Sequence, residues 1–127
     1  EWNPSDYAYH LTRRARGMAL WFSLAVNGTD AYRDAVEASL HLARETAGLI
    51  QTKAHLTLLR KPELSVVLYR RNGWSQADYG RWSMQLVRDQ VGFVTPTKWE
   101  GETVARLAFL HPNTTLAMVE EILDSMQ

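Results

Sequence analysis

Residues 18–26 are apolar at every position except Ser23. A helix of this composition is apolar around its whole circumference, so it requires burial on all sides. A chain of 127 residues forms one domain with one core, which leaves little surface to enclose such a helix. The run is also about half of the ~18 residues that a membrane span needs. The sequence therefore predicts a helix that packs on a surface from outside these residues, and we expect the chain to be a piece of a longer polypeptide.

This first helix is predicted to begin at Leu11 or Thr12 and to end at Asn27-Gly28, with Gly28 as its C-terminal cap. Thr29 is suited to cap a second helix. Apolar residues then recur at three- and four-residue spacing, and charged residues occupy the opposite face. The apolar positions, with two small polar ones, are Tyr32, Ala35, Val36, Ser39, Leu42, Ala43, Thr46, Leu49 and Ile50. The second helix is therefore expected to cover a core with one face.

Four short segments are rich in strand-forming residues. They are residues 56–59, 64–71, 91–95 and 103–110. Ser75 and Asp78 predict a capped helix between the second and third, and a last helix follows Thr115. Strands joined by short turns pair antiparallel. The predicted fold class is α+β, with a four-stranded, mostly antiparallel sheet and helices on one face.

Composition excludes several classes of function. Fourteen basic and 14 acidic residues balance, so the general charge gives no reason to expect nucleic acid or an anionic membrane as a partner. There is no cysteine, and the four histidines are widely scattered, so neither a thiolate site nor a metal site is indicated. We expect a cytoplasmic protein without a metal.

Arginines stand out at two places. Arg13, Arg14 and Arg16 fall near the predicted start of a helix, where positive charge is unfavourable. They form either a solvated face or a site for a carboxylate or phosphate. Arg106 is alone in the apolar segment 104–110, where it is either an edge-strand charge or a residue that reaches into a site.

Three segments resemble group II pyridoxal-phosphate-dependent decarboxylases, which act on aromatic amino acids, histidine, glutamate or diaminobutyrate. Residues 11–21 are similar to the segment that follows the family's catalytic loop: Thr12, Arg13, Arg14 and Trp21 match, while Ala19 replaces a lysine. The junction 28–32 looks like the family's break between two helices. Residues 106–115 are similar to its final strand and Arg…Asn-Pro-x-Thr-Thr ending, with His111 where asparagine is common.

The resemblance implies the small C-terminal domain of a fold-type I enzyme. Residues 1–28 would be a lead-in and linking helix that packs on a large cofactor-binding domain, and residues 29–127 would form the small domain. The parent would be a homodimer that removes the α-carboxylate of an L-amino acid, with pyridoxal phosphate as the electron sink. Thr12 and Arg106 would contact the substrate, and other residues would form dimer surface.

The lysine that holds the family's cofactor lies in a segment without a counterpart here. Lys98-Trp99 superficially resembles that segment, but its surroundings predict a turn. We therefore expect no catalytic residue and no covalently bound cofactor in this chain, which should be inactive alone. Two alternatives remain. One is a stand-alone α+β interaction or ligand-binding module. The other is a sulfur-metabolism lyase of the same fold type, which would lack the double arginine.

Overall fold

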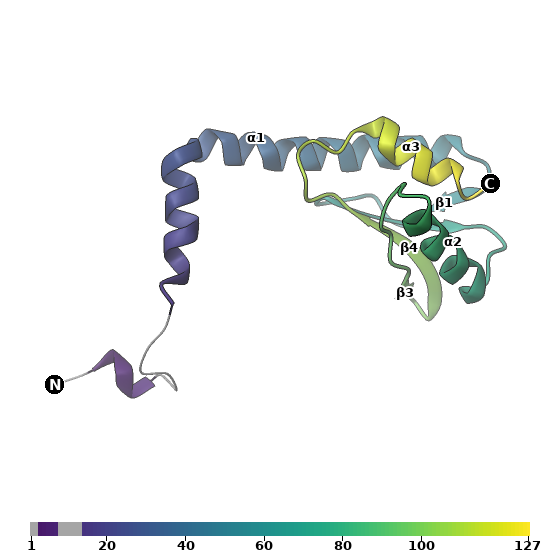
Figure 1. Cartoon of the computed structure of the whole chain (residues 1–127). Helices are drawn as coiled ribbons and strands as arrows, with labels where there is room; N and C mark the ends of the chain where they lie inside the picture. The colour runs from purple at the N-terminus through teal and green to yellow at the C-terminus, as the bar shows by residue number, and fades with distance from the viewer. Residues whose placement is uncertain (1–2, 8–13) are drawn as a thin grey trace. The chain divides into compact units, whose positions relative to one another are not determined.

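The structure is a computed structural model that describes residues 3–7 and 14–127. The chain divides into two compact units, Glu1–Asp34 and Ala35–Gln127. The elements, in chain order, are η1 (Pro4–Tyr7), α1 (Arg16–Thr52), β1 (Leu56–Leu58), β2 (Val66–Arg71), α2 (Gln76–Arg88), β3 (Thr97–Trp99), β4 (Glu102–Ala108) and α3 (Leu116–Asp124) (Figure 1). The predicted helix start at Leu11 or Thr12 lies outside the described residues.

Gly28 interrupts α1. Its backbone angles are φ 76° and ψ 164°, a region that is open essentially to glycine alone. An added Cβ would meet no atom within 4 Å, so the backbone conformation, not crowding, requires glycine. Beside the break, the Asn27 side chain donates to the Ser23 carbonyl at 2.9 Å, and the Tyr32 hydroxyl donates to the Ser23 hydroxyl. The predicted helix break is confirmed, whereas the predicted domain boundary between residues 28 and 29 remains a prediction.

The sheet has the strand order β1-β2-β4-β3, and every neighbouring pair is antiparallel. In the centre, Leu68 of β2 stands opposite Arg106 of β4. Glu100 and Gly101 join β3 to β4, and both have positive φ, 50° and 85°. Two such residues form the type I′ turn whose twist matches a hairpin. The predicted α+β fold class, with a four-stranded antiparallel sheet, is confirmed.

The strand predicted at residues 91–95 is wrong. The third strand, β3, follows Pro96 instead of ending there. The reason is tertiary: the Ser83 hydroxyl of α2 donates to the Val94 carbonyl at 2.6 Å, and the Val94 side chain is buried in the core. These contacts hold the segment to α2, so it does not pair with β4. The other three predicted strands are present, with bounds that differ by one or two residues.

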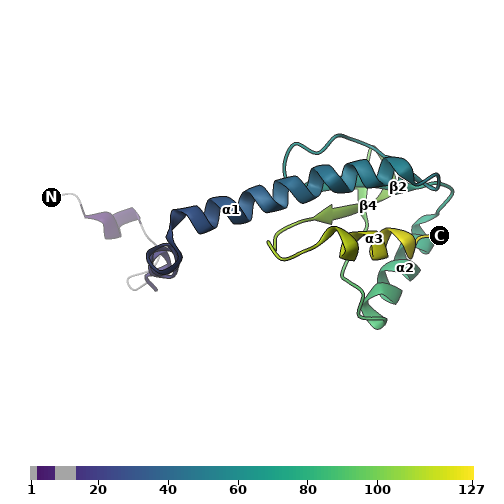
Figure 2. The same cartoon turned by 90° about the horizontal axis from the view of Figure 1, so that it is seen from above.

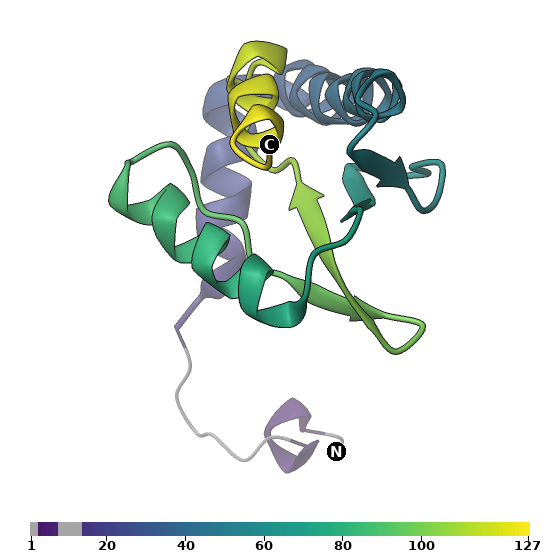
Figure 3. The same ribbon diagram turned by 90° about the vertical axis from the view of Figure 1, so that its right-hand side faces the viewer.

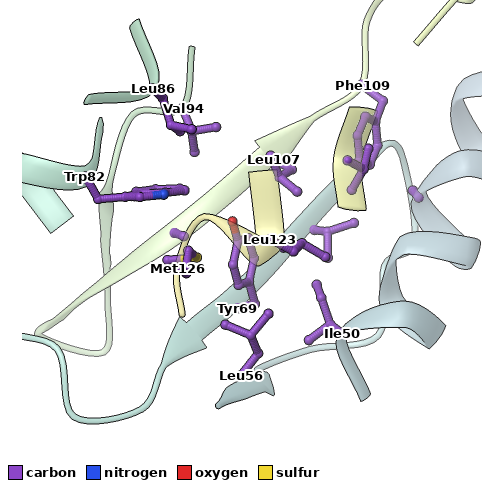
Figure 4. Packing of buried hydrophobic residues seen from close by; sticks show 14 of the residues in the cluster. Ile50, Leu56, Tyr69, Trp82, Leu86, Val94, Leu107, Phe109, Leu123 and Met126 are labelled. Carbon is purple, nitrogen blue, oxygen red and sulfur yellow. The ribbon is translucent and has the colours of Figure 1, made fainter. Parts of the chain in front are cut away.

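One core joins all three helices to one face of the sheet. Alternate residues of β2 and β4, namely Val67, Tyr69, Ala105 and Leu107, are buried in it. They meet Leu42 and Ile50 of α1, Tyr79, Trp82 and Leu86 of α2, and Val119 and Leu123 of α3. Figure 4 shows Ile50, Tyr69 and Leu123 converging in this core. Figures 2 and 3 show α3 lying between α1 and α2. The expectation of helices on one face is therefore confirmed.

The end of the chain is tied to three other elements. The Trp82 indole donates to the Ser125 hydroxyl at 2.8 Å, and the Arg71 guanidinium donates to the Met126 carbonyl at 2.6 Å. Lys53, at the end of α1, forms an ion pair with Asp124. Met126 is fully buried. These contacts fix α3 against α1, α2 and β2.

Gln90 ends α2 in a strained conformation. Its φ is 59°, in the left-handed region that favours glycine. The Val91 N–H donates to the Leu86 carbonyl at 3.0 Å and the Gln90 N–H to the Val87 carbonyl at 3.2 Å, the Schellman pattern in which glycine usually stands at the position of Gln90.

We expect Gln90→Gly to raise the free energy of unfolding by about 0.5–1 kcal/mol, because relief of a left-handed strain of about 1–2 kcal/mol exceeds the added chain entropy of glycine. Urea denaturation measures the change. Arg88→Gly, inside the same helix, is the matched control and should destabilise by about 0.5–1 kcal/mol. Equal losses in both variants would show that the conformation of Gln90 carries no strain.

Candidate functional site

Arg106 projects from the face of the sheet opposite the core. Its neighbours in β4, Ala105 and Leu107, are buried, while the Arg106 side chain is exposed. Among the residues that the structure describes, none accepts a hydrogen bond from its guanidinium or forms an ion pair with it. By contrast, Arg70 on the same face pairs with Glu102. Arg106 is therefore a free cation at the last strand.

A cavity of about 500 Å³ adjoins Arg106. Its walls are residues 106–109 of β4 and just beyond it, the segment 89–94 that connects α2 to β3, and one side of α3. Phe93, Met118 and Ile122 make much of the wall apolar. Its volume falls within the range of about 300–1,000 Å³ that ligand sites in proteins commonly have.

The charged groups that line the cavity differ in their hydrogen-bond partners. The Asp89 carboxylate accepts two hydrogen bonds of 2.9 Å from the Gln85 amide. Glu121 is exposed, and Arg106 is the one cation among the lining residues that the structure describes. Arg106 is therefore the one cationic residue next to this cavity, within the described chain, that could pair with a carboxylate or another anion.

The sequence did not reveal this cavity. In the sequence, Glu120 and Glu121 have the pattern of a solvated helix face, and no motif marks the segment 89–94. Both glutamates are indeed exposed, and Glu120 lies 3.8 Å from Lys53. One signal was present: Gly92 is the lone glycine in an apolar stretch, and an added Cβ would approach Ile122 of α3 to 3.1 Å. A glycine in such a stretch marks a close approach of backbone to another element.

The described residues do not fit a pyridoxal-phosphate site on their own. The chain has three lysines, Lys53, Lys61 and Lys98, and none of them lines the cavity beside Arg106. Lys53 is paired with two carboxylates, and Lys61 and Lys98 are exposed. Lys98 lies on β3 opposite Thr103. That this chain holds no cofactor covalently stays a prediction.

The second predicted substrate residue, Thr12, lies outside the described residues, as does Arg13. Arg14 and Arg16 are exposed, and neither has an ion pair among residues 3–7 and 14–127. The first turn of α1 contains no acidic residue. Both interpretations of the arginine cluster therefore remain open.

The apolar part of α1 carries large exposed side chains. Leu20, Trp21, Phe22 and Val26 are 59%, 61%, 63% and 65% exposed. Exposure on this scale at consecutive apolar positions is typical of an interaction surface.

No group of three metal-ligating side chains occurs in the part of the chain that the structure describes. Within the same part, no helix is both long and apolar enough to cross a membrane.

No family model matches the chain. Solved structures do match it. A glutamate decarboxylase domain from Vibrio parahaemolyticus, of a protein described as diaminobutyrate-pyruvate transaminase and L-2,4-diaminobutyrate decarboxylase, is 21% identical with a TM-score of 0.80. Tryptophan decarboxylase from Catharanthus roseus, in complex with L-tryptophan, is 17% identical with a TM-score of 0.79. TDC from Oryza sativa, with PLP, is 16% identical with a TM-score of 0.80.

The three similarities cover nearly all of this chain and a minor part of each similar protein. They extend over 96%, 96% and 98% of the chain but over only 27%, 27% and 29% of those structures. The matched part is the C-terminal portion of those proteins. The chain thus has the fold of the C-terminal portion of group II pyridoxal-phosphate-dependent decarboxylases. The fold that the sequence resemblance implied is confirmed.

Proposed function

We propose that this chain is the C-terminal part of a pyridoxal-phosphate-dependent decarboxylase that removes the α-carboxylate of an L-amino acid. The observation that carries the proposal is the match in fold to decarboxylases over 96% of the chain at a TM-score of 0.80. The resemblance of residues 11–21 and 106–115 to the same enzymes supports it independently of the fold. The cofactor would be held by the rest of the enzyme, since the described residues do not fit it.

In this proposal Arg106 is the main polar residue that the small domain contributes to the active site. It lies beside a cavity, its guanidinium has no partner among the described residues, and its planar fork is suited to bind a carboxylate with two hydrogen bonds. Thr12 would lie at the substrate side of the same active site. That role rests on its position before the double arginine in the family pattern.

The exposed apolar side chains of α1 fit a contact with the large cofactor-binding portion. Trp21 and Phe22 are bulky enough to fill pockets of a partner surface, and aromatic residues are enriched at interfaces. A homodimer, with part of its surface supplied by this chain, and a location in the cytoplasm complete the proposal.

The alternative, a stand-alone interaction or ligand-binding module, is favoured by one observation. Unit Ala35–Gln127 has its own core, built from all three helices, and a cavity of ligand size. A stand-alone module should bury the apolar part of α1 in a homodimer, whereas a part of a larger enzyme should leave it exposed when isolated. Sedimentation of the isolated chain, with Trp21→Ser as a control, distinguishes the two.

The proposal is tested by release of labelled carbon dioxide from carboxyl-labelled L-amino acids. The sample is the native polypeptide that contains these residues, with and without added pyridoxal phosphate. Release that depends on the cofactor and on one or a few amino acids is expected. Absence of release from all proteinogenic amino acids and from diaminobutyrate would contradict the proposal.

For Thr12 we expect an effect on substrate preference. In the intact enzyme, Thr12→Leu should change the ratio of kcat/KM between amino acids by about threefold to tenfold, because a larger side chain alters the fit of the substrate side chain. Thr12→Ser is the matched control, since it keeps the hydroxyl that a helix N-cap requires. A loss of stability with an unchanged ratio would show that Thr12 is only a helix cap.

A further inference from the structure

One edge of β4 is open over half of its length. On this edge β3 pairs with β4 at three positions, Thr97 with Val104, Lys98 with Thr103 and Trp99 with Glu102. β4 continues to Ala108, while its other edge pairs with β2 up to that residue. The chain before β3 turns away, since Val94 is held by Ser83 of α2.

Backbone hydrogen-bonding groups point out of this open edge. The Phe109 N–H donates to the Ser65 carbonyl beyond the start of β2, at 2.9 Å. Backbone groups of successive residues in a strand alternate between its two edges. Leu107 and Ala105 therefore direct theirs toward β2, and Arg106 and Ala108 direct theirs toward the open edge. An edge of this kind is a template for a further strand.

The open edge is also recessed. The cavity of about 500 Å³ lies against it, between the segment 89–94 and α3. Because the edge is flanked by the segment 89–94 on one side and by α3 on the other, a single extended peptide suits it better than the edge of a second folded sheet. The shape therefore selects an extended segment.

We propose that this groove binds an extended peptide segment from outside these 127 residues, which adds to β4 as an antiparallel strand. Antiparallel addition continues the direction of β3 along the same edge. The N–H and carbonyl groups of Arg106 and Ala108 bond to the peptide backbone, which is the recognition mode known as β-augmentation. This proposal goes beyond the decarboxylase function and does not depend on it.

The side chains around the edge define the peptide's chemistry. Residues directly opposite each other on two strands project to the same face. The peptide residue opposite Arg106 lies beside its unpaired guanidinium, so it is acidic. The residue opposite Leu107 projects to the core face, into the cavity walled by Phe93 and Ile122, so it is apolar.

When such a peptide is bound, Arg106 still has free N–H donors for a second anion. A guanidinium has five N–H donors, and one carboxylate uses two of them in the bidentate arrangement. The peptide carboxylate would fix the side chain in place while the remaining donors stay free. A peptide partner and a substrate contact are therefore compatible roles for this residue.

Amide hydrogen exchange of the chain without any peptide tests the open edge itself. The amides of Arg106 and Ala108 should exchange at least about tenfold faster than those of Leu107 and Phe109, because opening is not needed to expose them. Equal protection of all four amides would mean that residues 93–95 close the edge in solution, which would overturn the proposal.

Titration with the peptide acetyl-Val-Thr-Val-Glu-amide, followed by amide spectra, tests the binding. Glutamate is placed opposite Arg106, and the second valine, which precedes glutamate, is placed opposite Leu107. We expect shifts and slowed exchange at Arg106 and Ala108. The same peptide with N-methyl groups on threonine and glutamate should not bind, and glutamine in place of glutamate should weaken binding about threefold.

Ala108→Pro removes one outward N–H and should weaken binding about tenfold, whereas Ala108→Val keeps the N–H and should bind as the wild type does. The N-methylated peptide provides the same test if the proline variant does not fold. No change at Arg106 and Ala108 with the unmodified peptide, or equal binding of the N-methylated one, would refute the proposal.

Discussion

Tyr79→Phe is expected to lower the free energy of unfolding by about 1–3 kcal/mol, while Tyr69→Phe leaves it unchanged or raises it by up to about 1 kcal/mol. Both tyrosines are fully buried. The Tyr79 hydroxyl accepts a hydrogen bond of 2.7 Å from the Arg71 N–H, so its removal leaves a part-buried backbone donor without a partner. The Tyr69 hydroxyl is buried and has no hydrogen-bond partner in the described part of the chain, so its removal eliminates a desolvated group that gains nothing.

Urea denaturation of the two variants measures this contrast, and each variant is the control for the other. Both substitutions remove one buried hydroxyl from the same core, so a common effect of lost packing would appear in both. Equal destabilisation by the two substitutions would contradict the account and would indicate that a water molecule satisfies Tyr69.

Tyr69 and Tyr79 also predict that the free energy of unfolding falls at alkaline pH. Burial raises the pKa of Tyr69 far above its usual value, and the charge of Tyr79 adds to the effect. The folded chain therefore keeps a proton that the unfolded chain loses at the ordinary tyrosine pKa of about 10. The stabilising contribution is complete below that pH and is lost above it, by up to about 1.4 kcal/mol per pH unit. Tyr69→Phe should remove this loss.

Arg106→Lys is expected to reduce kcat/KM of the intact enzyme by at least about tenfold, or about 1.4 kcal/mol of transition-state stabilisation. Lysine keeps the charge but not the planar fork that binds a carboxylate with two hydrogen bonds. Since the Arg106 side chain is exposed and has no partner within the described chain, the substitution should not affect folding.

Arg60→Lys is the matched control for this experiment. Arg60 forms an exposed ion pair with Glu63 in the turn before β2, far along the chain from the cavity residues. Its replacement should leave kcat/KM unchanged. Wild-type kinetics in Arg106→Lys, with unaltered unfolding in urea, would show that Arg106 is only a surface charge on the sheet.

Local signals were sufficient to predict most of the fold. Ser75 and Asp78 form the predicted capping box at the start of α2, and Gly28 breaks α1 at the position where the end of the first helix was predicted. These features depend on residues close together in the chain, so the sequence displays them directly. In β4, Arg106 and Ala108 are exposed while Leu107 between them is buried, which is the alternation expected of a strand with one covered face.

Features that depend on distant residues were missed. Residues 91–95 have strand composition, but Ser83 and the core hold Val94 elsewhere. The cavity beside Arg106 exists because β3 begins only at Thr97, so it pairs with β4 no further than Val104, and because α3 lies beside the unpaired part of β4. Neither event has a signature in the local sequence apart from Gly92. Thus the sequence predicted the strand that carries the candidate site but not the hollow next to it.

We propose that this chain is part of a pyridoxal-phosphate enzyme whose cofactor lysine lies elsewhere. Borohydride reduction of the native polypeptide that contains these residues, followed by peptide mapping, tests it most directly. The account predicts one phosphopyridoxyl-lysine outside the 127 residues and none at Lys53, Lys61 or Lys98. A stoichiometric adduct at one of these three lysines, or a native polypeptide that carries no adduct at all, would contradict the account.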